Sequence, residues 1–170
     1  VEKAEVPDES ASACFDSGLE LGRWREVNGG THAAFGLGAG VLAAAVTEPE
    51  LPSIAMVTAG VVSGLLPDLD EERSMIYNRT MRNIDPKMRR PLVGLIGALL
   101  LFLSVLEFSY GFLLAGVFFL GAAVFRHRTF SHSIVSLVLV TGAAHELHPD
   151  LTVPVMLGYL SHLLADSLTI

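Results

Sequence analysis

The chain has 170 residues, enough for one domain, and only 17% of them are charged, whereas a soluble domain usually carries about 25%. The charges crowd into residues 1–31 and 67–90, which predicts an integral membrane protein because a bilayer core has no water to solvate a charge. The net charge of −7 argues against nucleic acid as a partner, and a single cysteine, Cys14, excludes an internal disulfide.

The first segment, residues 1–31, is polar and rich in Glu, Ser, Asp and Gly. This composition is typical of a mobile N-terminal tail. The remainder, residues 32–170, is expected to form one membrane-embedded helical domain.

Six apolar segments follow the tail and predict an all-α integral membrane bundle of about six short helices. They cover 32–46, 52–66, two parts of 91–125, 133–144 and 151–168. Most are shorter than the ~20 residues of a typical spanning helix. Either six tilted helices cross a thin bilayer or some segments are re-entrant, and we favour six crossings. Closely spaced glycines suit tight helix packing in lipid: Gly36, Gly38, Gly40, Gly60, Gly64, Gly94 and Gly97.

The stretch 91–125 is too long for one crossing. As a single helix it would measure about 52 Å, whereas the hydrocarbon core is about 30 Å thick. Glu107, near its middle, would also cost roughly 2.5–3.5 kcal/mol at the bilayer centre. We therefore predict a helical hairpin that turns around residues 107–111.

The basic residues are distributed asymmetrically over the loops of this six-helix arrangement. All eleven Lys and Arg fall on the side that holds residues 1–31, 67–90, 126–132 and the C-terminal end. The positive-inside rule makes that side cytoplasmic. The sequence therefore predicts a multi-pass protein of the cell inner membrane.

Potential metal ligands lie on the same basic side, and we expect them to converge. The seven candidates are His32, Asp68, Asp70, His127, His132, His162 and Asp166. Singly, most have an ordinary interpretation as solvated loop or helix-end residues. Together they come from four separate segments to one membrane depth, which predicts a metal site. Imidazole with carboxylate favours a divalent transition metal, with Zn or Mn preferred over Ca or Mg.

Spacing refines this prediction. His162 and Asp166 are four residues apart, on one helix face within an apolar segment, where ionisable groups normally have a partner. His127 and His132 would point about 140° apart on a helix, so we expect a non-helical turn there, with Ser131 capping the following helix. Seven candidates exceed the three or four protein ligands of one zinc site. Either some of them orient ligands, or two ions share the site.

Three motifs together resemble the YdjM-like (LexA-regulated) family of predicted inner-membrane, metal-dependent hydrolases. They are Pro67-Asp68-Leu69-Asp70, the His-Arg-Thr-Phe-Ser-His-Ser run at 127–133, and Gly158-Tyr159-Leu160-Ser161-His162 with Asp166. The resemblance covers about residues 31–170. It implies a multi-helix membrane fold with the seven candidates as ligands. Relatives usually continue into further apolar sequence after the aspartate, which allows for a chain truncated at its C-terminus.

Two functional hypotheses follow. The first is a metal-dependent hydrolase at the cytoplasmic membrane surface, acting on a small-molecule or lipid substrate. Arg126 and Arg128 flank His127, and because guanidinium matches phosphate oxygens in pairs, they favour a phosphoester such as a lipid headgroup. Positive-inside topology explains these arginines equally well. The alternative is a non-enzymatic membrane carrier or sensor of metal or other ions. Clustering at one end favours a site over a transport path. His145 and His148, on the far side, are expected to be loop residues.

Overall fold

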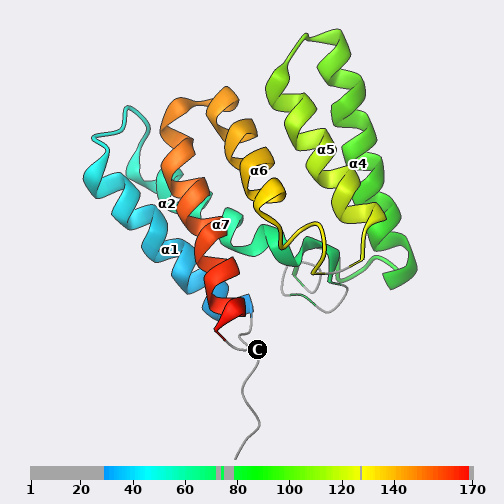
Figure 1. Ribbon diagram of the computed structural model, residues 1–170, viewed down its shortest axis with the longest axis horizontal. Helices are drawn as coiled ribbons and strands as arrows, with labels where there is room; N and C mark the ends of the chain where they lie inside the picture. The colour runs from blue at the N-terminus through cyan, green and yellow to red at the C-terminus, as the bar shows by residue number, and fades with distance from the viewer. Residues whose placement is uncertain (1–28, 72–73, 75–78, 127, 169–170) are drawn as a thin grey trace, which may run out of the picture.

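The computed structural model describes residues 29–168, except 72–73, 75–78 and 127, and the described part contains α-helices and short 3-10 turns but no strand (Figure 1). The elements are α1 (Gly29–Val46), α2 (Ser53–Leu65), the 3-10 turn η2 (Leu66–Asp70), α4 (Pro86–Leu106), α5 (Tyr110–Val124), α6 (Ile134–Leu147), the 3-10 turn η3 (Pro149–Leu151) and α7 (Thr152–Ser167). The predicted all-α class is confirmed. The predicted tail lies almost wholly outside the described residues, and α1 begins slightly before the expected domain start.

The predicted helical hairpin is present. Helix α4 ends at Leu106 and α5 begins at Tyr110, so the turn falls at Glu107, where the cost of burying a carboxylate in lipid required it. Phe108 takes the left-handed conformation, with φ of 49°. The Ser109 hydroxyl accepts a hydrogen bond from the backbone N–H of Phe112 at 3.4 Å and caps α5.

Helix α4 is longer at its start than the apolar pattern indicated. Asp85 accepts the N–H of Lys87 at 2.9 Å, and Pro86 occupies the first helical turn, where its missing N–H costs nothing. Pro91, where the apolar segment begins, therefore lies inside the helix. Polarity changes at Pro91, but the capping signal that starts the helix lies upstream.

Glycines allow α1, α2 and α7 to pack closely. A Cβ on Gly60 of α2 would lie 2.9 Å from Cα of Gly40 in α1 and would also overlap the Gly36 carbonyl. A Cβ on Gly158 of α7 would meet the Gly60 carbonyl carbon at 3.1 Å. Gly38, in contrast, has open space around it. Tight glycine packing is thus confirmed for the α1–α2–α7 unit, but Gly38 is not part of it.

The hairpin joins this unit through α6 and through aromatic contacts. Helix α4 packs on α5, α5 packs on α6, and α6 packs on α7. Phe118 of α5 and Tyr159 of α7 are both fully buried, with ring centroids 6.3 Å apart in an edge-to-face arrangement. This contact holds the middle of α7 in place. The ionisable residues His162 and Asp166 follow it in the last turns of the helix.

The helices expose extensive apolar surface. Helices α1 and α4 have the length and composition to cross a membrane, whereas α2, α5 and α6 are apolar but shorter. Only 22% of the apolar window in α1 and 17% of that in α4 is buried within the molecule, so these side chains do not serve mainly to fill the protein's own core. Crossing by all six helices stays a prediction.

Gly60→Ala should destabilise the protein by about 1–3 kcal/mol, because an added methyl forces apart helices whose backbones are in contact. The matched change Gly38→Ala should be neutral or stabilise by about 0.5–1 kcal/mol, because it adds helix propensity without a clash. Unfolding of the purified protein in detergent would measure both. Equal stabilities would contradict the close packing of α1 and α2.

Candidate metal centre

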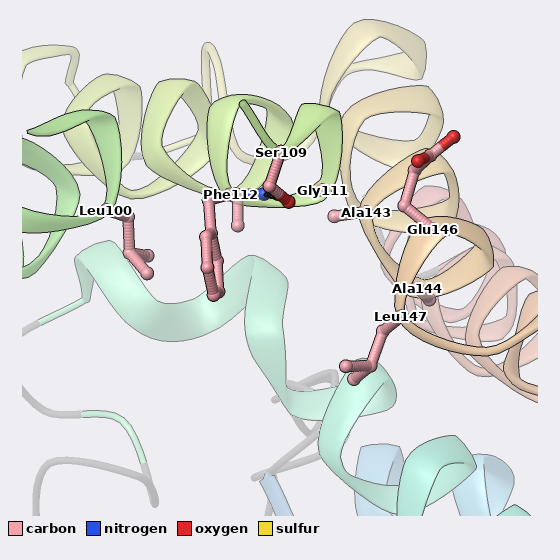
Figure 2. Close-up of a pocket in the computed structure, with 9 residues that line it drawn as sticks. Leu100, Ser109, Gly111, Phe112, Ala143, Ala144, Glu146 and Leu147 are labelled. Carbon is pink, nitrogen blue, oxygen red and sulfur yellow. Dashed lines mark hydrogen bonds between the residues drawn. The ribbon is translucent and has the colours of Figure 1, made fainter. Parts of the chain in front are cut away.

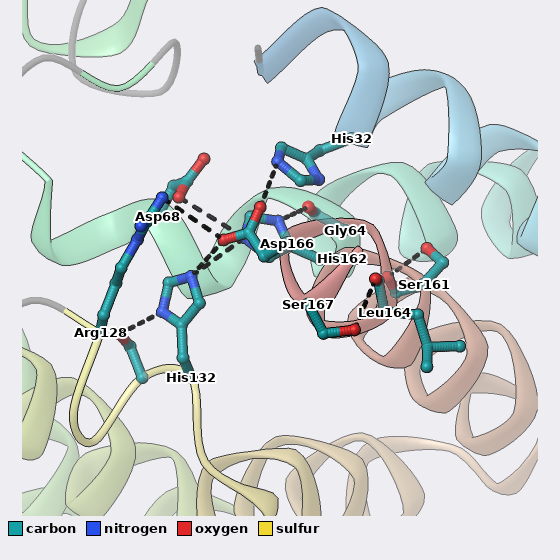
Figure 3. Close-up of polar contacts among 12 residues, drawn as sticks. His32, Gly64, Asp68, Arg128, His132, Ser161, His162, Leu164, Asp166 and Ser167 are labelled. Carbon is teal, nitrogen blue, oxygen red and sulfur yellow. Dashed lines mark hydrogen bonds and ion pairs between the residues drawn. The ribbon is translucent and has the colours of Figure 1, made fainter. Parts of the chain in front are cut away.

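Five of the predicted ligands come together at one end of the bundle, at the lower edge of Figure 1 (Figure 3). They are His32 at the start of α1, Asp68 in η2, His132 in the loop before α6, and His162 and Asp166 near the end of α7. The candidate ligands that the six-helix arrangement placed on one side therefore do converge in the described part of the chain.

His162 is the most enclosed of these residues, with no exposed surface. Its Nδ1 lies 2.8 Å from the backbone carbonyl oxygen of Gly64, which can only accept a hydrogen bond. Nδ1 must therefore carry the proton, and Nε2 of the neutral ring presents its lone pair. That Nε2 lies 3.5 Å from Oδ1 of Asp68 and 3.6 Å from Oδ2 of Asp166.

His132 approaches Nε2 of His162 from the loop between α5 and α6. Its Nε2 lies 3.0 Å from Oδ2 of Asp166 and 3.3 Å from Nε2 of His162. Its Nδ1 lies 3.1 Å from the hydroxyl of Ser131, and the Tyr159 hydroxyl donates to the Ser131 carbonyl. Ser131 and Tyr159 are both fully buried, so this side of the ring is held by packing as well as hydrogen bonds.

Ser131 does not cap α6 as predicted. Ser133 caps it, accepting the N–H of Ser136 at 3.2 Å. The non-helical turn delays the start of the helix, so the later serine meets the first free N–H groups, and Ser131 is left to contact His132 instead. The predicted non-helical conformation is confirmed for the described residues of this loop.

His32 contacts the cluster from α1. Its Nε2 lies 3.2 Å from Oδ1 of Asp166, and its ring stacks on that of His162 with centroids 3.7 Å apart and planes inclined by 20°. Asp166 thus receives imidazole nitrogens on both oxygens: His32 on Oδ1, and His132 with His162 on Oδ2.

The spacing of these atoms fits a divalent metal ion. Ligand nitrogens and oxygens held about 2.1 Å from a tetrahedral ion lie about 3.4 Å from one another. The Oδ2 atom of Asp166 and the Nε2 atoms of His132 and His162 are 3.0–3.6 Å apart. Two overlapping groups could hold an ion: His132 with His162 and Asp166, and His32 with Asp68 and His162.

The remaining predicted residues differ in what the structure says of them. His127 lies outside the described residues, and Asp70 is described only in its backbone, within η2. Arg126 is exposed, and binding of substrate by its side chain stays a prediction. Arg128 has its guanidinium 4.0 Å from Oδ2 of Asp166, with 59% of its side chain exposed. Its φ of 63° is in the left-handed region, which is uncommon for a residue with a Cβ.

A cavity of about 200 Å³ opens beside the cluster. It is lined by Arg128, His132, Leu163, Asp166 and Ser167. A small group that enters there would meet the Arg128 guanidinium and the Asp166 carboxylate together.

A larger cavity, about 350 Å³, lies at the opposite end, between the α4–α5 hairpin and α6 (Figure 2). Its walls are mostly apolar, as at Leu100 and Phe112, and its one ionisable residue is Glu146, whose carboxylate points away from these two side chains. His145 and His148 are also at that end, but the prediction that both are loop residues holds only for His148, because α6 continues to Leu147 and includes His145 in its last turn. His145 pairs with Thr152 at 3.0 Å, and His148 lies 3.7 Å from Asp150.

Sequence reasoning missed three groups that hold the imidazoles: the Gly64 carbonyl, the Ser131 side chain and the Tyr159 hydroxyl. Tyr159 had a usable signal, since it lies one helical turn before His162. The Gly64 carbonyl had none, because any backbone carbonyl could accept from the ring and only the close approach of α7 to α2 selects this one.

The fold and the cluster together define an all-helical protein with imidazole and carboxylate groups suited to a divalent metal ion at one end. The chain belongs to the YdjM inner membrane protein family, whose family model matches residues 27–170. The family predicted from the three motifs is thus confirmed. Neither the comparison with curated proteins nor that with solved structures found a match.

If the cluster binds metal, the purified protein should contain at least one transition-metal ion per chain, and His162→Ala should lower that content severalfold by removing a central donor. His145→Ala, at the opposite end, is the matched control and should leave it unchanged. Elemental mass spectrometry of the protein in detergent would measure both. Full occupancy in His162→Ala would exclude His162 from the site, and loss in His145→Ala would place the site at the wrong end.

Proposed function

We propose that this protein is a membrane-bound metal-dependent hydrolase that acts on a phosphoester, such as a lipid headgroup, at the cytoplasmic face. The observation that carries the proposal is the position of Arg128, beside the His–Asp cluster at the mouth of the cavity. A site for binding metal alone has no need of an exposed guanidinium next to its carboxylate.

The chain itself would hold the ion through His132, His162, Asp68 and Asp166. A divalent ion there would lower the pKa of a water molecule towards neutrality and polarise the bond under attack. The protein excludes solvent from the inner side of the cluster, where His162 is fully buried. It leaves the side of Arg128 and Asp166 open to the cavity.

Arg128 is suited to bind the anionic part of a substrate. Its planar guanidinium can donate two parallel hydrogen bonds to phosphate oxygens. Its contact with Asp166 at 4.0 Å is loose and most of the Arg128 side chain is exposed, so a phosphate can compete for the guanidinium. The Arg128 side chain extends towards Asp68 and Asp166 (Figure 3).

The orientation in the membrane follows from charge. The described basic residues lie in the loop before α4, at the start of α4 and in the loop after α5, at the same end as the cluster: Arg79, Arg82, Lys87, Arg89, Arg90, Arg126 and Arg128. The positive-inside rule then favours six crossings with the cluster on the cytoplasmic side. There the headgroups of the inner leaflet are within reach of the cavity.

The carrier or sensor alternative is less well supported. A path across the membrane needs ionisable groups along its length. Helices α2 and α5 contain no charged residue or histidine, and α1 contains only His32. The charged residues and histidines of the described helices lie towards the helix ends, which favours a surface site.

Arg128→Lys should preserve membrane insertion and metal content but lower turnover about 10–100-fold, because lysine keeps the charge and loses the paired donors. His132→Ala should instead lower metal content and turnover together. A screen of phosphoesters, including phospholipids, with added Zn or Mn would provide the assay. If the metal-loaded wild type cleaves nothing among phosphoesters, esters and amides, the hydrolase proposal fails and the carrier or sensor remains.

Single cysteines test the orientation in a Cys14→Ser background. Cysteines at Glu50 and Leu147, both exposed at the end away from the cluster, should react with an impermeant maleimide in right-side-out spheroplasts. A cysteine at Asn83, exposed in the loop before α4, should react only after the membrane is opened. Reaction at Asn83 alone in sealed spheroplasts would invert the topology.

A further inference from the structure

The three described histidines of the cluster differ in what their Nδ1 atoms contact. Nδ1 of His162 lies 2.8 Å from the Gly64 carbonyl, and Nδ1 of His132 lies 3.1 Å from the Ser131 hydroxyl. Nδ1 of His32 is buried and has no hydrogen-bond partner among the residues that the structure describes. All three rings direct Nε2 towards the cluster.

This difference bears on which rings can bind a metal. A histidine that binds through Nε2 carries its proton on Nδ1, and ligating histidines almost always donate that proton to a carbonyl, carboxylate or water. His162 and His132 satisfy this rule. If His32 were a ligand, its Nδ1–H would be buried without an acceptor, which is unfavourable. Nδ1 lacks a partner in either tautomer, but with the proton on Nε2 the His32 ring gains a charge-assisted hydrogen bond to Asp166 that it would not have as a ligand.

We propose that His32 is a positioning residue, not a metal ligand: its Nε2–H donates to Oδ1 of Asp166 and turns Oδ2 towards the ion. This inference rests on the proposed metal site and departs from the ligand set that the family resemblance implies. The two oxygens of Asp166 then have separate tasks. Oδ1 accepts from His32 at 3.2 Å, and Oδ2 faces His132 and His162.

The number of ions follows from the same assignment. Both groups that could hold an ion include His162, and its Nε2 has one lone pair, so it can bind one ion at a time. If His32 is not a ligand, the group of His32, Asp68 and His162 keeps only Asp68 and Nε2 of His162, and that nitrogen is shared with the other group. The described residues then form one centre, the group of His132, His162 and Asp166, and Asp68 is the one further carboxylate beside it, 3.5 Å from the shared nitrogen of His162.

The stacking of His32 on His162 supports this role. Centroids 3.7 Å apart and an inclination of 20° place the two rings face to face, so their Nε2 atoms lie in nearly parallel planes. The stack holds the His32 ring where its edge meets Asp166. His32 is 1% exposed, so its ring is shielded from water.

Zinc K-edge X-ray absorption of the full chain, loaded with zinc alone in detergent, would count the imidazole ligands. We expect His32→Gln and the control His145→Gln to keep the number of imidazole ligands found in the wild type, and His132→Gln to have one fewer. Zinc affinity should be within a few-fold of wild type in His32→Gln, because the glutamine amide can still donate to Asp166. His32→Phe, which keeps a ring but no donor, should lose about 10–100-fold in affinity.

One imidazole fewer in His32→Gln than in the wild type would overturn the assignment and make His32 a ligand. An affinity loss equal in His32→Gln and His32→Phe would also overturn it, because the donated hydrogen bond would then have no effect. A wild type that takes up no zinc would overturn the proposed metal site itself. The failures are therefore distinguishable, and His32→Gln decides the question even if His32→Phe does not fold.

Discussion

The Asp166 carboxylate is the group on which the rest of the site depends. It is only 15% exposed and lies within 3.2 Å of His32, 3.0 Å of His132 and 3.6 Å of His162, with Arg128 at 4.0 Å. Burying a charge is costly unless it is paired or coordinates a cation. The fold meets that requirement by bringing imidazole nitrogens to Asp166 from α1, from the loop before α6 and from α7 itself: the His32 ring can donate to the carboxylate, and the other two rings can share a cation with it. A short polar cluster can therefore exist at the end of so apolar a bundle.

The close packing of the helices sets the geometry of the site. His162 of α7 reaches the Gly64 carbonyl of α2 only because α7 and α2 lie close together at Gly158 and Gly60. That bond sets which nitrogen of His162 faces the cluster. A side chain at the glycine contacts would move α7 outwards, and the imidazole would lose the acceptor that fixes its tautomer. Glycines one helical turn before His162 and Gly64 thus determine how these two groups meet.

The exposed surface, like the interior, has an apolar part along the helices and a polar part at the end that carries the cluster. The outward faces of α1 and α4 are apolar along their length, which suits a hydrocarbon surrounding, and the described basic residues gather at the end that carries the cluster. In the proposed orientation this end lies at the depth of the lipid headgroups, where both water and phosphate would be within reach. The cavity beside Arg128 opens there, whereas the larger apolar cavity at Glu146 lies at the other end.

The sequence by itself determined the all-α class, which follows from the apolar segments, and the hairpin around Glu107, which follows from the cost of a charge in lipid. It also determined the convergence of the ligand types, because the number of crossings decides which loops share a side of the bundle. It also predicted the shared face of His162 and Asp166 from their spacing. Only the tertiary structure decided the start of α4, the role of Ser131 and the separate states of the histidines. The tautomer of a ring depends on the neighbour at its second nitrogen, and for His162 that neighbour is a backbone oxygen 98 residues away, which no local pattern encodes.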